Sequence, residues 1–155
     1  MMQAIKRMLG SRILLATAIA GTLDIGMAAI ETARADKPVG NMLRGLASGP
    51  FPPATDWGRA GAVLGLGIHY AIMAVMVTVF LLARDRIALV RAHTLIAAAL
   101  YGVGLWLVMY GLVLPLRFGA PFPSANPVAI AKQLFAHVVL VGLTIGLVAR
   151  RERSA

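Results

Sequence analysis

The stretch Ala20-Gly21-Thr22-Leu23-Asp24-Ile25-Gly26 lies inside an apolar run from Ile13 to Ile30 and places one carboxylate between two glycines. The run is long enough for a transmembrane helix, which takes ~20 predominantly apolar residues. A charged side chain inside a bilayer is costly, so it faces the protein interior or a water-filled cavity. The rest of the chain is therefore interpreted as a scaffold that holds Asp24 away from lipid.

The composition places the chain in the membrane class. Its 155 residues are 59% hydrophobic and only 14% charged, which leaves too little polar surface for a soluble globule. Four spans with short connections would use nearly the whole length, so residues 1–155 are predicted to form a single membrane domain. The chain has no cysteine, which excludes disulfides, thiolate metal sites and cysteine nucleophiles.

Four apolar segments are predicted to be transmembrane helices, at about residues 12–32, 60–83, 94–116 and 128–149. Between the first two, proline, glycine and charged residues indicate a substantial loop. Within that loop, Val39 to Ala47 has a helical apolar spacing interrupted by Arg44, which predicts a short helix in the membrane interface, with Trp57 at the headgroup level. The expected fold is an all-α, four-helix transmembrane bundle.

The first apolar run has an alternative interpretation. It follows a basic segment, as the core of a secretory signal does, and Ala33-Arg34-Ala35 resembles a cleavage site. Asp24 within the run and Glu31 at its end are unlike a signal core. We therefore expect a retained first helix rather than a cleaved signal.

The distribution of Lys and Arg predicts the orientation. With both termini inside, the cytoplasmic segments hold nine of the 15 basic residues, and an excess of Lys and Arg is typical of the cytoplasmic side. The nine are Lys6, Arg7, Arg12, Arg84, Arg86, Arg91, Arg150, Arg151 and Arg153. The net charge of +9 lies at span ends, where basic side chains meet lipid headgroups, so nucleic-acid binding is not expected. The predicted location is the bacterial inner membrane.

Three helices place an ionisable group at one depth. Counting from the span ends at ~1.5 Å per residue puts Asp24 and His69 ~12 Å, and His137 ~13 Å, from the outer boundary. Tyr110 comes within a turn of the same level. These four residues are the predicted polar layer, and the cost of exposing them to lipid predicts that they face inward. His93, at the cytoplasmic end of the third helix, is expected among solvent or headgroups.

Glycines are expected to let the helices pack closely, because lipid gives helices no hydrophobic reason to associate. Gly142 and Gly146 lie roughly opposite the polar face of their helix, so this face is interpreted as a contact with another protein. The packing glycines are Gly21, Gly61, Gly65, Gly104, Gly111, Gly142 and Gly146.

Four roles for the polar layer remain open. The first is a structural hydrogen-bond cluster that joins Asp24 to a histidine or to Tyr110. The second is a b-type haem or another tetrapyrrole ligated by His69 and His137. The third is a proton-linked path in which Asp24 and the histidines exchange protons. The fourth is an enzyme acting on lipid or quinone, but no nucleophile or metal motif accompanies the layer, so an enzyme is not expected.

Several segments occur in an order that suggests a relative: Gly21-Thr22-Leu23-Asp24, Ala47-Ser48-Gly49, Gly65-Leu66-Gly67-Ile68-His69, the span Tyr101 to Pro115, Ala136-His137 and Ala149-Arg150-Arg151. In these segments the chain resembles an uncharacterised family of small four-helix bacterial inner-membrane proteins. The resemblance implies the fold and the location, and it carries over no catalytic residue. The charges Glu31, Arg34, Asp36 and Lys37 exceed what the resemblance implies, which suggests a particular partner.

The expected function is that of a non-enzymatic accessory or assembly subunit, without a cofactor, in a larger membrane complex such as a respiratory or photosynthetic one. Membrane lipids and other integral membrane proteins are the expected partners, and a homo-oligomer is possible. The alternative is a haem-binding or proton-coupled four-helix protein that uses Asp24, His69 and His137.

Overall fold

The computed structural model describes residues 2–150, with side chains from Leu9 to Arg150. The protein is 87% helical, and the described residues contain no strand. Four of the basic residues counted for the orientation fall outside the described residues. They are Lys6 and Arg7, whose side chains are not described, and the whole of Arg151 and Arg153.

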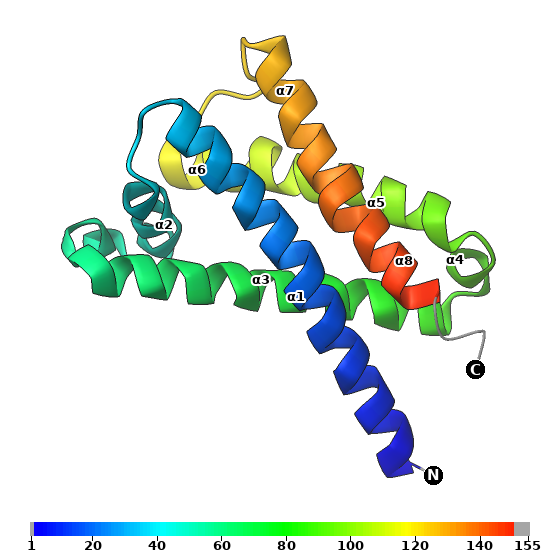
Figure 1. The fold of residues 1–155 in the computed structure, drawn as a ribbon. Helices are drawn as coiled ribbons and strands as arrows, with labels where there is room; N and C mark the ends of the chain where they lie inside the picture. The colour runs from blue at the N-terminus through cyan, green and yellow to red at the C-terminus, as the bar shows by residue number, and fades with distance from the viewer. Residues whose placement is uncertain (1, 151–155) are drawn as a thin grey trace.

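The helices follow one another in a simple order (Figure 1). The first long helix, α1 (Met2–Arg34), is followed by α2 (Val39–Ser48), a 3-10 turn η1 (Pro52–Asp56) and the long α3 (Gly58–Arg86). The short α4 (Ala88–Ala92) leads to α5 (Thr94–Val108), which continues through the π-helical η2 (Met109–Val113) into α6 (Leu114–Phe118). The last helix consists of α7 (Pro127–Leu134), the π-helical η3 (Phe135–Leu143) and α8 (Thr144–Arg150).

Four helices are long and apolar enough to cross a membrane, as predicted, at Leu9–Arg34, Gly58–Arg86, Thr94–Phe118 and Pro127–Arg150. They extend beyond the predicted limits because flanking charged residues, such as Arg34 and Arg86, end the apolar run without ending the helix. Two capping residues bound the connection between the third and fourth of these helices. Gly119 (φ 64°) closes α6 in the left-handed region, and the Asn126 side chain caps α7 by accepting from the N–H of Val128 at 2.9 Å.

The outward faces of these helices are apolar. Leu14, Val63, Leu100 and Val128 lie on four different spans and are between 59% and 73% exposed. Fully burying one such side chain is worth about 1.5–3 kcal/mol, so a water-soluble chain would not leave all four spans uncovered. The four candidate transmembrane helices indicate a multi-pass membrane protein.

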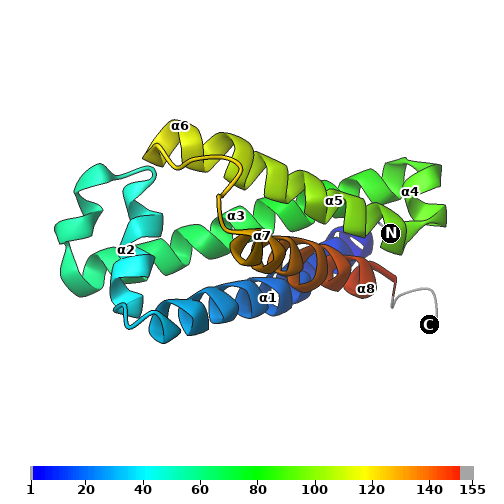
Figure 2. The same cartoon turned by 90° about the horizontal axis from the view of Figure 1, so that it is seen from above.

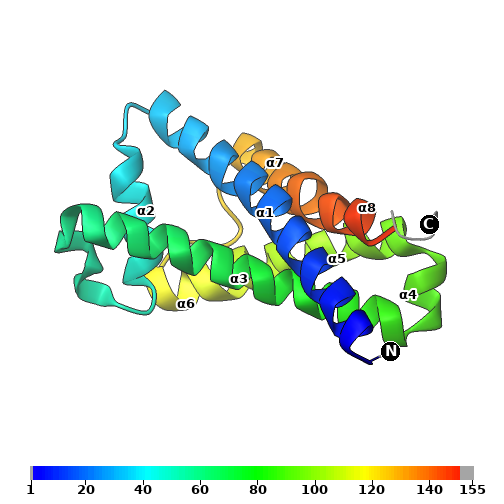
Figure 3. The same cartoon turned by 60° about the horizontal axis from the view of Figure 1, so that its bottom comes forward.

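The helices cross tightly in one half of the bundle and diverge in the other. Helix α1 crosses α3, and α7 to α8 runs beside α1 (Figures 1 and 3). Seen from above, α2 and α6 lie at the end opposite both termini (Figure 2). The buried core belongs to the crossing half and consists of Ala16, Ala20, Met73, Val77, Phe80, Leu81, Ala98, Leu105, Val141, Ile145, Val148 and Ala149.

Five of the seven predicted packing glycines lie against another element, namely Gly21, Gly61, Gly65, Gly142 and Gly146. Two do not: Gly104 is exposed with open space around it, and Gly111 only touches the ring of Phe122 at ordinary distance. The partner assigned to the Gly142 face was wrong. A Cβ at Gly142 would overlap Ala98 O, and one at Gly146 would lie 2.6 Å from Ala98 Cβ, so this face packs on the chain's own α5.

Helix α2 ends one residue later than predicted and is packed on α3. A Cβ at Gly65 would overlap the carbonyl of Leu43, and the stem of Arg44 lies over Gly61, at 3.2 Å from a Cβ placed there. Arg44 therefore covers a glycine rather than interrupting an apolar face. Arg117 secures the end of α2 by donating from Nη2 to Ser48 O at 2.8 Å.

The contact between α2 and α3 predicts that alanine at two neighbouring glycines, Gly65 and Gly67, changes the free energy of unfolding differently. Gly65→Ala should lower the free energy of unfolding by about 1–3 kcal/mol, because the added methyl group forces two backbones apart. Gly67→Ala is the control, since Gly67 has open space around it, and it should be neutral or stabilise by up to about 1 kcal/mol through helix propensity. Thermal unfolding in mild detergent measures both, and equal effects would contradict the contact.

Candidate intramembrane site

The diverging half of the bundle contains an open cavity of ≈ 410 Å³, here called the outer cavity. Residues of α1, α2, α3, η2, α6, α7 and η3 line it. All four members of the predicted polar layer are among them, namely Asp24, His69, Tyr110 and His137. The tertiary structure thus brings together side chains that the sequence placed only at one depth.

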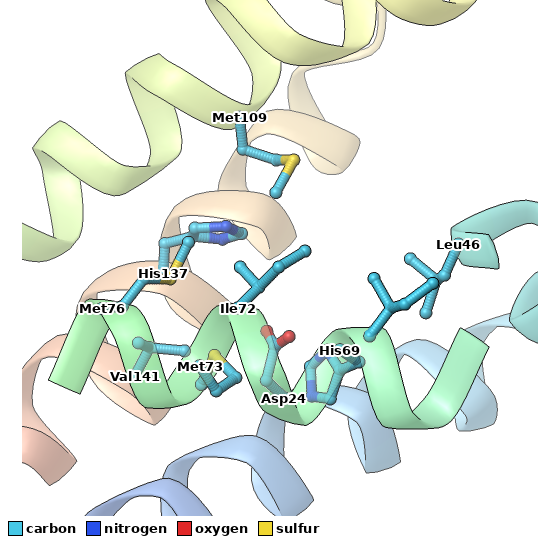
Figure 4. A pocket seen from close by; sticks show the side chains of 10 residues that line it. Asp24, Leu46, His69, Ile72, Met73, Met76, Met109, His137 and Val141 are labelled. Carbon is cyan, nitrogen blue, oxygen red and sulfur yellow. The ribbon is translucent and has the colours of Figure 1, made fainter. Parts of the chain in front are cut away.

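A smaller cavity of ≈ 70 Å³, the inner cavity, adjoins the outer one (Figure 4). Asp24, His69, His137, Leu46 and Met109 line both. Beyond these shared residues the inner cavity extends toward the core, where it is lined by Ile68, Ile72, Met73, Met76 and Val141. It is therefore an apolar space with three ionisable side chains at its wall.

His69 holds α3 against α1. It is 8% exposed, and its Nε2 lies 2.9 Å from the carbonyl oxygen of Gly21, one turn before Asp24. A carbonyl only accepts, so Nε2 carries the proton of this bond and Nδ1 has the lone pair in the neutral ring. The adjacent Thr22 Oγ1 and Tyr70 hydroxyl, 2.8 Å apart, join the same two helices.

His137 is fixed by the local geometry of η3. Its Nδ1 lies 3.0 Å from the carbonyl oxygen of Gln133, so Nδ1 donates and the neutral ring has its lone pair on Nε2. The Tyr110 ring packs edge-on against the imidazole, at 5.6 Å between centroids. Gln133 is held in turn by the indole of Trp106, whose Nε1 donates to Oε1 at 3.2 Å. Two π-helical segments, η2 and η3, thus supply one wall, and such segments are frequent at functional sites.

Asp24 differs from the histidines. Its side chain is partly buried and borders both cavities, yet no side chain or backbone group of the described residues makes a hydrogen bond or ion pair with it. The hydrogen-bond cluster expected between Asp24 and a histidine or Tyr110 was therefore wrong. The two imidazoles bond instead to backbone carbonyls, because those carbonyls lie closer along their own or the neighbouring helix.

The histidines are not equivalent as ligands. Metal-binding histidines commonly use one ring nitrogen and donate from the other, and His137 is held in this way with Nε2 left over. His69 has its Nε2 on Gly21 O, so an iron between the two rings would have to bind it through Nδ1. The geometry offers one imidazole, not two, with a free Nε2 for a haem. Within residues 9–150, no group of three or more His, Asp or Glu side chains is placed to hold a metal ion.

An ion pair lies at the rim of the outer cavity. Lys132 of α7 donates to Glu31 of α1, and Arg34 contacts the other oxygen of Glu31 at 3.3 Å. The excess of charge after the first helix is visible in the sequence, but its pairing with Lys132 is not, because Glu31 and Lys132 are 101 residues apart. Two cations thus neutralise Glu31, which leaves Asp24 as the one carboxylate on the wall of the outer cavity without an ion-pair partner among the described residues.

Comparison with protein-family models, with curated proteins and with solved structures finds no match to this chain. The resemblance noted from the sequence therefore rests only on the segments that suggested it. The site has to be interpreted from its own chemistry.

Proposed function

We propose that this chain is a non-enzymatic, multi-pass protein of the bacterial inner membrane with both termini in the cytoplasm. The gathering of basic residues at one end of the bundle supports this orientation. Arg12 of α1 lies 4.0 Å from Asp85 at the end of α3, and a cavity at the same end is lined by Arg84, Arg91 and Arg150. An accumulation of Lys and Arg favours the cytoplasmic side.

Single cysteines test the orientation, because the natural chain has none. Ala88→Cys lies at α4 and Ala125→Cys in the connection before α7, and both positions are exposed. In intact cells we expect a membrane-impermeant maleimide to label Ala125→Cys and to label Ala88→Cys only after permeabilisation. The reverse pattern would contradict the proposed orientation.

The polar cavity is proposed to take up and release protons in a proton-linked process. The observation that carries this proposal is Asp24, a carboxylate on one of the long apolar helices that borders two cavities and has no hydrogen-bond or ion-pair partner among residues 9–150. Intramembrane carboxylates and histidines are expensive and typically belong to ion or proton pathways. The lone pairs on His69 Nδ1 and His137 Nε2 provide two further proton acceptors on the same wall.

Neutralising the carboxylate tests this role. Protein reconstituted in liposomes should speed the decay of an imposed pH gradient, followed with an internal pH dye, and Asp24→Asn should return the rate to that of empty liposomes. Asp36→Asn is the matched control, since Asp36 is exposed at a turn with φ 54°, a conformation that Asn also adopts. A rate unchanged by Asp24→Asn would contradict the proposal.

A second proposal concerns partners: the chain acts as an accessory or assembly subunit of a larger membrane complex. Gly67 of α3 and Gly104 of α5 support it, because both are exposed and a Cβ at either would meet nothing within 4 Å. No contact in the described part of the chain requires glycine at these two positions, whereas small residues allow close approach of a foreign helix. The Gly142 face, which packs internally, no longer supports a partner.

Enlarging these glycines tests the partner face. After extraction in mild detergent, the natural chain should migrate with a larger complex, and Gly67→Leu or Gly104→Leu should release it without unfolding it. Val79→Leu, an exposed change on α3, should leave the complex intact. Migration of the natural chain only as a free monomer or homodimer would contradict the proposal.

A further inference from the structure

The sulfur atoms of the described side chains are gathered at the site. Five methionines have described side chains, and all five line the two cavities: Met27 and Met42 the outer one, Met73 and Met76 the inner one, and Met109 both. Leu, Ile and Val, by contrast, also occupy the exposed outer faces of the helices. Methionine fills irregular apolar gaps, and in these cavities it does so beside two imidazoles and one carboxylate. Thioether, imidazole and carboxylate groups around one space form a set of possible ligands.

The inner cavity limits what that ligand can be. Its ≈ 70 Å³ holds an ion with at most a few water molecules. A haem or a quinone ring is far too large. Most of the remaining wall is branched aliphatic, from residues such as Ile68, Ile72 and Val141. A hydrated ion would therefore have to exchange its water for protein ligands.

The donors around this space are three thioethers, two imidazoles and one carboxylate. Met73, Met76, Met109, His69, His137 and Asp24 all line this cavity (Figure 4). Thioether sulfur is a soft ligand that selects Cu(I), and imidazole also suits copper, whereas Mg²⁺ and Ca²⁺ take oxygen ligands. Carboxylates and imidazoles alone form no metal site here, but the thioethers complete a soft donor set.

We propose that the inner cavity binds one soft monovalent cation of the Cu(I) class. Met76 Sδ, Met109 Sδ and His137 Nε2 are its ligands, and the Asp24 carboxylate balances its charge, because a buried charge needs a counter-charge. Met27 and Met42 line the way in through the outer cavity. The inference uses the cavity of the proposed proton-linked function and names a ligand for it.

The test measures Cu(I) binding by the full chain in detergent, under anaerobic reducing conditions, in competition with a coloured Cu(I) chelator. The natural chain should withdraw about one equivalent of Cu(I), and X-ray absorption should show sulfur and nitrogen neighbours. The double variant Met76→Leu and Met109→Leu keeps side-chain volume and should weaken binding at least about tenfold, as loss of ligands does. His137→Gln should weaken it, and His93→Gln, an exposed histidine outside both cavities, should not.

Thermal unfolding of each variant shows whether it is folded. Repeating the binding measurement with Ag(I), which has no accessible redox chemistry under these conditions, makes the result independent of copper oxidation. No binding by the folded natural chain, or unchanged binding by the folded double variant, would overturn the proposal. The proton measurement in liposomes contains no metal. Proton movement that depends on Asp24 without binding of Cu(I) or Ag(I) would therefore contradict only the cation site. Binding of Cu(I) without proton movement would contradict only the proposed proton-linked function.

Discussion

The architecture depends on close approach of helix backbones in one half of the bundle. Lipid provides no hydrophobic drive for helices to associate, so small residues must let them touch. Gly102 and Gly142 do this between α5 and η3, where a Cβ on either would overlap a backbone carbonyl of the other helix. Ala16 and Ala20 of α1 are fully buried in the same region. The helices cross there, and crossing at one end forces them to diverge at the other.

Divergence creates the space in which the polar side chains lie. If all four helices stayed in contact along their length, Asp24 would be buried against apolar neighbours without water or a counter-charge, at a high cost. The open half lets the carboxylate border a cavity instead. His69 stands at the junction between the two halves, and its bond to Gly21 O anchors α3 to α1 one turn before the carboxylate.

The site is also shaped by irregular helix geometry. A strict period of 3.6 residues predicts one continuous face along the last span, and it correctly groups Gln133 with His137. It does not predict that residues 135–143 are π-helical or that Gly102, absent from the expected packing set, meets the backbone of His137 and Val138. Widened turns arise from contacts with neighbouring helices, so no local sequence signal identifies them. No local sequence signal identifies the grouping of the five described methionines either, because they are scattered along the chain and come together only in the folded structure.

The sequence by itself determined the all-α class, the number of long apolar helices and the inward position of Asp24, His69 and His137, because apolar length and helical periodicity are local properties. Only the tertiary structure decided which groups meet. It left Asp24 without the expected hydrogen bond, paired Glu31 with Lys132 across the outer cavity and turned the Gly142 face inward. These outcomes depend on crossing angles and side-chain reach between distant segments, which depth and periodicity along a single helix do not specify.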